Sequence, residues 1–184
     1  MKRAIVLLCL VLLSGCSGQE QALDDVLSLR AKLLSQSVQF QATVTADYGD
    51  KIYSFSMECT ADSGGKLRFT VLSPDTIAGI SGSVSESGGS LQFDGQALAF
   101  DALADGLISP VSGPWVLMKT LRSGYLTSCA EEGTYLRVAI DDSYADNALH
   151  LDIWLGEDDL PVRSEIYWQG RRLLSIEVKD FAFV

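Results

Sequence analysis

The chain has 184 residues, of which 47% are hydrophobic, and its 14 basic and 24 acidic side chains give a formal net charge of -10. This length fits one domain, and the composition is typical of neither a disordered nor a fibrous protein. A pI near 4.4 argues against nucleic-acid binding, which needs a basic face. The mean hydropathy of +0.19 is high for so acidic a chain, so apolar residues must be concentrated somewhere.

The N-terminus has the pattern of a secretory signal. Basic residues at Lys2 and Arg3 precede an unbroken apolar run from Ala4 to Leu13. As a helix this run would be about 15 Å long, too short for a bilayer core of about 30 Å. We therefore expect residues 1–15 to be removed as a signal peptide, which would change the formal net charge from -10 to -12.

The apolar run ends in Leu13-Ser14-Gly15-Cys16, which resembles the bacterial lipobox. That resemblance implies that Cys16 is diacylated and becomes the first residue of the mature protein; the alternative is an ordinary signal peptide with an accidental cysteine. Two acyl chains suffice for stable membrane anchoring. We expect residues 16–22 to form a lipidated tether and residues 23–184 a single domain outside the cytoplasm, with the choice of outer or inner membrane left open.

Residues 19–35 are predicted to form an amphipathic helix. Asp24 and Asp25 come early and Arg30 and Lys32 late, an order that suits the helix dipole. Apolar side chains recur at helical spacing and are expected to face the core: Leu23, Val26, Leu27, Leu33 and Leu34.

After residue 37 the apolar period changes from helical spacing to two, which predicts strands. The predicted strands are residues 38–48, 53–60, 67–71, 78–85, 90–100, 125–129, 135–140, 149–155, 162–168 and 173–183. Residues 101–124 interrupt the pattern with a loop and a short helix that begins near Pro114. The sequence thus predicts a mostly β, α+β fold: a large curved antiparallel sheet or barrel of about ten or eleven strands, whose concave face is covered by two helices.

No catalytic or metal-binding constellation accompanies the only histidine, His150, which alternates with leucines on a predicted strand. We interpret it as a solvent-facing residue. The glycines match no phosphate-binding loop. The acidic segments 141–147 and 157–159 could bind calcium, but they lack the EF-hand order, and we interpret them as hairpin tips. We expect no enzyme activity, no metal and no cofactor.

Besides Cys16, two cysteines lie on predicted strands of the mature chain. A disulfide between Cys59 and Cys129 is plausible in an exported protein, and two buried free thiols are equally plausible.

Two parts of the sequence resemble the LolA-type lipoprotein carriers. They are GKLRFTVLSP at 65–74 with IAGI at 77–80, and LPVRSEI at 160–166 with QG at 169–170 and IEVKDFAF at 176–183. The resemblance implies a half-open barrel with helices as a lid over an apolar cavity. The superfamily includes lipoprotein chaperones, glycolipid-binding lipoproteins and envelope stress sensors. This chain departs from the soluble carriers by its lipobox and from the anchored acceptor by its polar early turns.

Two functions follow as hypotheses. The first is a membrane-anchored lipoprotein that binds lipid or the acyl chains of lipoproteins in the cavity. Its candidate lining residues are Phe40, Phe55, Met57, Phe69, Val71, Ile80, Phe93, Trp115 and Met118, although each could instead belong to a dry core. The second is a non-catalytic envelope protein that binds a cell-wall enzyme or another envelope partner.

Overall fold

A computed structural model describes residues 17–92 and 103–184. Within these residues the strands form one antiparallel sheet of ten strands in the order β5-β4-β3-β2-β1-β10-β9-β8-β7-β6, with β5 and β6 at its edges. The strands are β1 (Val38–Asp47), β2 (Ile52–Ala61), β3 (Leu67–Ser73), β4 (Ser81–Ser85), β5 (Gly88–Gln92), β6 (Tyr125–Glu132), β7 (Tyr135–Asp141), β8 (Leu149–Leu155), β9 (Pro161–Trp168) and β10 (Arg171–Phe183). The predictions for Cys16 and Phe93 lie outside the described residues.

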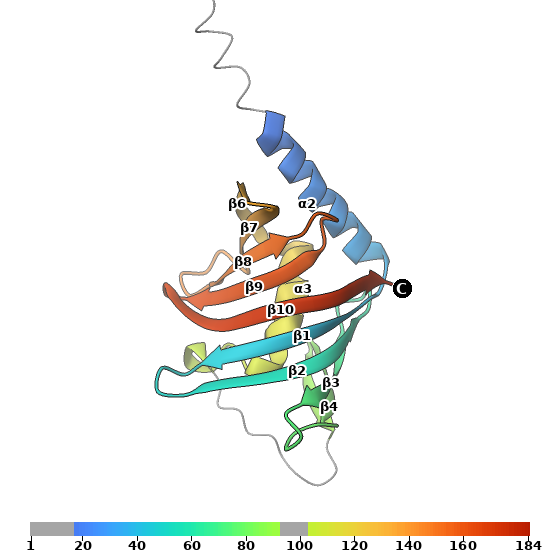
Figure 1. Cartoon of the computed structure of the whole chain (residues 1–184). Helices are drawn as coiled ribbons and strands as arrows, with labels where there is room; N and C mark the ends of the chain where they lie inside the picture. Colours follow the sequence, from blue (N-terminus) through green and yellow to red (C-terminus); the bar gives the residue numbers. More distant parts are fainter. Residues whose placement is uncertain (1–16, 93–102) are drawn as a thin grey trace, which may run out of the picture.

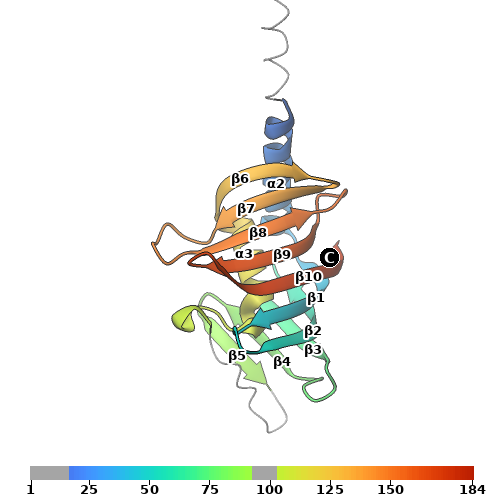
Figure 2. The ribbon, with the colours of Figure 1, turned by 60° about the vertical axis from the view of Figure 1, so that its left-hand side comes forward.

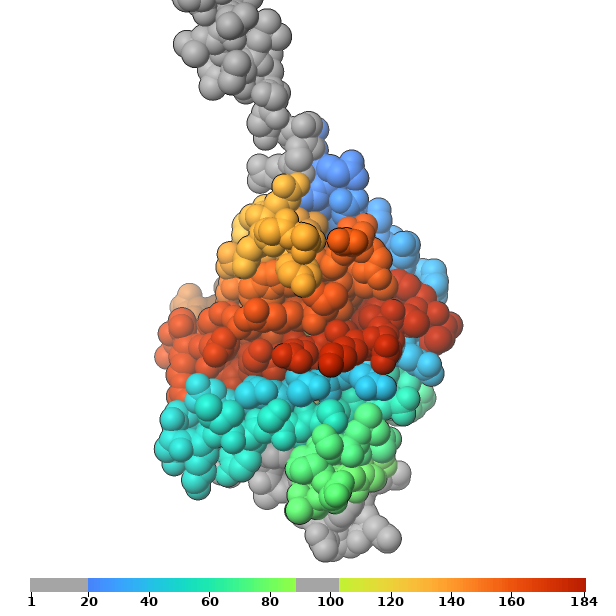
Figure 3. Space-filling view, in the orientation of Figure 1, coloured from blue at the N-terminus to red at the C-terminus, as the bar shows by residue number. Residues whose placement is uncertain are grey.

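The sheet is curved and joins two meanders at its centre. Strands β1–β5 form one meander and β6–β10 the other, and β1 pairs with β10 in a register that sets Val44 against Ile176. In the space-filling view, β1 and β10 lie side by side across the outer surface (Figure 3). The predicted mostly antiparallel sheet is confirmed, and it is not closed into a barrel.

The inner face of the sheet forms the core. On β1 the residues Val38, Phe40 and Val44 are buried while Gln39 and Gln41 are exposed, as strand alternation requires.

Helix α3 (Gly113–Ser123) covers the concave face, preceded by short 3-10 turns at Ala104–Gly106 and Pro110–Ser112 (Figures 1 and 2). Pro114 lies in its first turn, as expected. Leu117 and Leu121 are fully buried against the sheet. A Cβ atom on Gly113 would come within 2.9 Å of Leu174 Cδ1, so the start of the helix approaches the sheet closely.

Helix α2 (Ser17–Ser35) projects beyond the sheet and contacts α3 and β6 (Figure 1). Within the described residues α2 covers 17–35 and thus includes the predicted helix 19–35, so residues 17–22 of the expected tether are helical. No helix of the described segments is long and apolar enough to cross a bilayer.

The predicted apolar stripe of α2 is confirmed at Val26 and Leu33 and is wrong at its other three positions. Leu23, Leu27 and Leu34 are 40%, 48% and 56% exposed. The buried positions are Ala22, Val26, Leu29 and Leu33. Both sets have helical spacing, and packing against α3 and β6 selects the second.

Candidate functional site

Most residues predicted to line a cavity belong to the protein's own core. Seven of them are at most 3% exposed and share one hydrophobic cluster with Leu117 and Leu121 of α3: Phe40, Phe55, Met57, Phe69, Val71, Ile80 and Met118. They face inward as predicted, but α3 packs against this face and fills it. Of the candidates, Trp115 is half-buried at the margin of the cluster.

A groove of about 410 Å³ lies beside Trp115. The last turn of α2, helix α3, the β2–β3 turn and the β4–β5 turn contribute its walls. Its lining residues are Leu34, Gly64, Gly65, Lys66, Ser85, Glu86, Ser87, Trp115, Lys119, Arg122 and Ser123.

Hydrogen bonds from α3 fix the β2–β3 turn as one wall of the groove. Trp115 Nε1 donates to the Gly65 carbonyl at 3.0 Å. The Arg122 guanidinium donates to the carbonyl of Asp62 at 2.8 Å and to that of Ser63. Within the turn, the Lys66 amide donates to Asp62 Oδ1 at 3.0 Å. Helix and turn therefore hold one another in place.

Sequence reasoning found only Trp115 in this groove. Residues 64–66 and 85–87 lie far along the chain from residues 115–123, and only the folded sheet brings them together. The sequence contains one local indication of the groove, because Trp115, Lys119 and Arg122 share one helix face at spacings of four and three residues.

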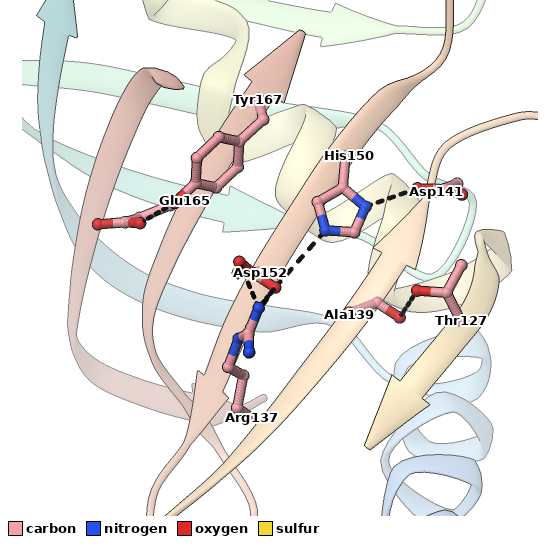
Figure 4. A network of polar contacts seen from close by, with 8 residues as sticks. All are labelled: Thr127, Arg137, Ala139, Asp141, His150, Asp152, Glu165 and Tyr167. Atoms are coloured by element: carbon pink, nitrogen blue, oxygen red, sulfur yellow. Dashed lines mark hydrogen bonds and ion pairs between the residues drawn. The ribbon is translucent and has the colours of Figure 1, made fainter. Parts of the chain in front are cut away.

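A second cluster of polar side chains lies on the outer face of β7, β8 and β9, opposite the core (Figure 4). His150 Nδ1 lies 2.7 Å from Asp141 Oδ1, and His150 Nε2 lies 3.6 Å from Asp152 Oδ1. Arg137 donates to both oxygens of Asp152, at 2.8 and 2.9 Å. The side chain of His150 is 40% exposed, which agrees with the solvent-facing prediction. Its carboxylate partners were not predicted from the sequence, because the pairing of β7 with β8 places them beside His150.

Glu165 is the most buried carboxylate of this cluster, at 4% exposure. It accepts hydrogen bonds from Arg163, Arg172 and the Tyr167 hydroxyl. Desolvation opposes ionisation, yet these donors keep the pKa of Glu165 below its ordinary value. Burial and the bond to Glu165 raise the pKa of Tyr167 to about 12. Because donors already engage this carboxylate, we interpret the cluster as structural.

Among the described residues, Cys59 and Cys129 are free thiols, and no disulfide joins them. Cys59 is buried on β2 and Cys129 half-buried on β6, and five strands lie between β2 and β6 in the sheet order. Burial raises the pKa of both thiols, although Arg30 opposes the shift at Cys129.

The acidic segments use carboxylates to shape their own turns. Asp142 Oδ1 accepts from the Leu149 amide at 2.8 Å, and Asp158 Oδ1 from the Leu160 amide at 3.2 Å. Residues 17–92 and 103–184 contain no group of three or more His, Cys, Asp or Glu side chains arranged to hold a metal ion.

No protein-family model matches the chain, and no curated protein matches it. Among solved structures, an uncharacterized conserved protein from Thermus thermophilus is 19% identical, with 91% of this chain and 88% of that chain covered and a TM-score of 0.47. A LolA superfamily protein from Nitrosomonas europaea is 9% identical, with coverages of 90% and 93% and a TM-score of 0.45. The Pseudomonas aeruginosa MucA/MucB complex is another of the matching structures. A separate structure of MucB is 15% identical to this chain. Its coverages are 91% and 59%, so this chain spans less than two thirds of MucB, and its TM-score is 0.47. The chain is similar to LolA-like proteins in fold, at low sequence identity.

Proposed function

We propose that this chain is a non-catalytic lipoprotein of the cell envelope, anchored through Cys16, that binds lipid or the acyl chain of a lipoprotein. The observation that carries the proposal is the groove of about 410 Å³ beside α3. Trp115 packs against the core and also lines this groove, and the half-exposed Leu34 gives a second apolar surface. Removing apolar surface from water at about 25 cal/mol per Å² would supply most of the affinity.

The packing of α3 limits how deeply an acyl chain enters. Leu117 and Leu121 occupy the space over the inner face of the sheet. A ligand therefore binds in the groove with α3 in place, or reaches the core residues only if α3 moves away from the sheet.

The test uses the chain as processed in a bacterium that matures lipoproteins. The protein is recovered from the membrane fraction, and the mass of its N-terminal peptide reports whether Cys16 is diacylated. Organic extraction and native mass spectrometry then identify any lipid that co-purifies. We expect a bound lipid, and we expect Leu34→Ser to reduce its retention about fivefold because that substitution removes apolar contact.

Leu72→Ser is the matched control, since Leu72 is 42% exposed on β3 and lies outside the groove. Absence of lipid from the extract, together with no uptake of a fluorescent fatty acid, would contradict the proposal. Recovery of one stoichiometric protein partner with the groove empty would favour the alternative, an envelope interaction protein.

A further inference from the structure

Cationic side chains gather in the groove although the chain is acidic. Lys66, Lys119 and Arg122 line it against one carboxylate, Glu86, in a protein of net charge -10. Among the described residues, none of these three cations forms an ion pair. The cations of the outer face differ, because Arg137, Arg163 and Arg172 each pair with a carboxylate.

The groove holds these charges in place without neutralising them. The acceptors of Arg122 are backbone carbonyls, which orient the guanidinium but carry no net charge, and the carboxylate of Asp62 in the same turn accepts from the Lys66 amide. Lys119 Nζ lies 5.4 Å from the centroid of the Trp115 ring, which attracts the ammonium group but carries no net charge. Cations that form no ion pair and lie in a partly enclosed groove favour an anionic ligand.

Apolar and hydroxyl groups complete the groove. Trp115 and Leu34 offer apolar surface next to the cations, and Ser85, Ser87 and Ser123 contribute hydroxyl groups. An anion without an apolar part would make no apolar contact with Trp115 and Leu34, and a neutral lipid would give the cations no negatively charged partner.

We propose that the groove recognises an anionic amphiphile, with a phosphate or carboxylate group at Lys66, Lys119 and Arg122 and its apolar part against Trp115 and Leu34. This inference rests on the proposed function and adds the charge of the ligand. Because the rest of the molecule is anionic and repels such a ligand at long range, recognition depends on these local contacts.

The test measures binding to the full, processed chain after delipidation in a neutral detergent. The probes are dioleoyl phosphatidylglycerol, dioleoylglycerol with the same acyl chains and no phosphate, and inorganic phosphate. We expect phosphatidylglycerol to bind about tenfold more tightly than dioleoylglycerol, since charge-assisted hydrogen bonds are the added contacts. The double variant Lys66→Gln/Lys119→Gln should reduce this difference, because two of the three cationic contacts are lost.

Lys51→Gln/Lys179→Gln is the matched control, because it removes the same charge from exposed positions outside the groove. Arg122 is left intact, since it also holds the β2–β3 turn. Equal binding of both lipids, unaffected by Lys66→Gln/Lys119→Gln, would overturn the anion site and leave the proposed function standing. Binding of neither lipid would overturn both. Phosphate binding as tight as that of phosphatidylglycerol would support the cationic site but overturn an amphiphile as its ligand.

Discussion

Glu165 shows how a single residue depends on its neighbours in a curved sheet. Its carboxylate is almost fully buried on the outer face, and Arg163, Arg172 and Tyr167 cover and hydrogen-bond it. A buried charge is tolerated only with such partners. Because the donors lower the pKa of Glu165 in the folded protein, its contribution to stability is present above the ordinary value of 4.5 and is lost as pH falls through the folded value.

Replacing Glu165 with Gln should therefore reduce stability in a pH-dependent way. At pH 7 we expect the free energy of unfolding to fall by about 2 kcal/mol, since charge-assisted hydrogen bonds are lost. At a pH low enough to protonate the wild-type carboxyl in the folded protein, the difference between the two proteins should shrink. Chemical denaturation at both pH values measures this, with Glu58→Gln, an exposed position on β2, as control. An equal difference at both pH values would mean that the charge of Glu165 is irrelevant.

At the scale of one element, the packing of helix α2 predicts different effects for two leucine substitutions. Leu29 is 3% exposed and Leu27 is 48% exposed, although the two are only two residues apart. We expect Leu29→Ala to lower the free energy of unfolding by about 2–4 kcal/mol through loss of burial and creation of a cavity. Leu27→Ala should cost less than about 1 kcal/mol. Thermal or chemical denaturation of the two variants measures the difference, and a larger loss for Leu27→Ala would mean that the side of the helix carrying Leu27 is the packed one.

Strands were predictable where apolar and polar residues alternate along the sequence, as they do along β1, whose side chains point by turns to the core and to the more exposed face. The predicted ranges 38–48 and 149–155 correspond to β1 and β8 within one residue. The buried face of α2 was predictable only in part, because Val26 and Leu33 were expected in the core but Leu27 has helical spacing too, and only contact with α3 and β6 decides which side is buried. The groove could not be predicted from local sequence patterns for a related reason. Lys66 and Lys119 belong to different parts of the chain, which come together only when α3 packs over the sheet.

At the scale of the whole molecule, the sheet order predicts where the fold is most resistant to opening. Strands β1 and β10 each have neighbours on both sides, whereas β5 and β6 are edges among the described strands. We expect amides of β1 and β10 to exchange hydrogen most slowly and those of β5 and β6 fastest, since local opening at an edge breaks fewer contacts. Hydrogen-exchange mass spectrometry of the full chain measures this, and protection of β6 equal to that of β10 would contradict it.

The central place of β10 also has a consequence for synthesis. Residues 171–183 are made after every other strand of the sheet, yet they pair with β1 and β9 and are the link between the two meanders. Until β10 has been made, no strand pairing joins β1–β5 to β6–β9, so the ten-stranded sheet cannot assemble before that segment is available.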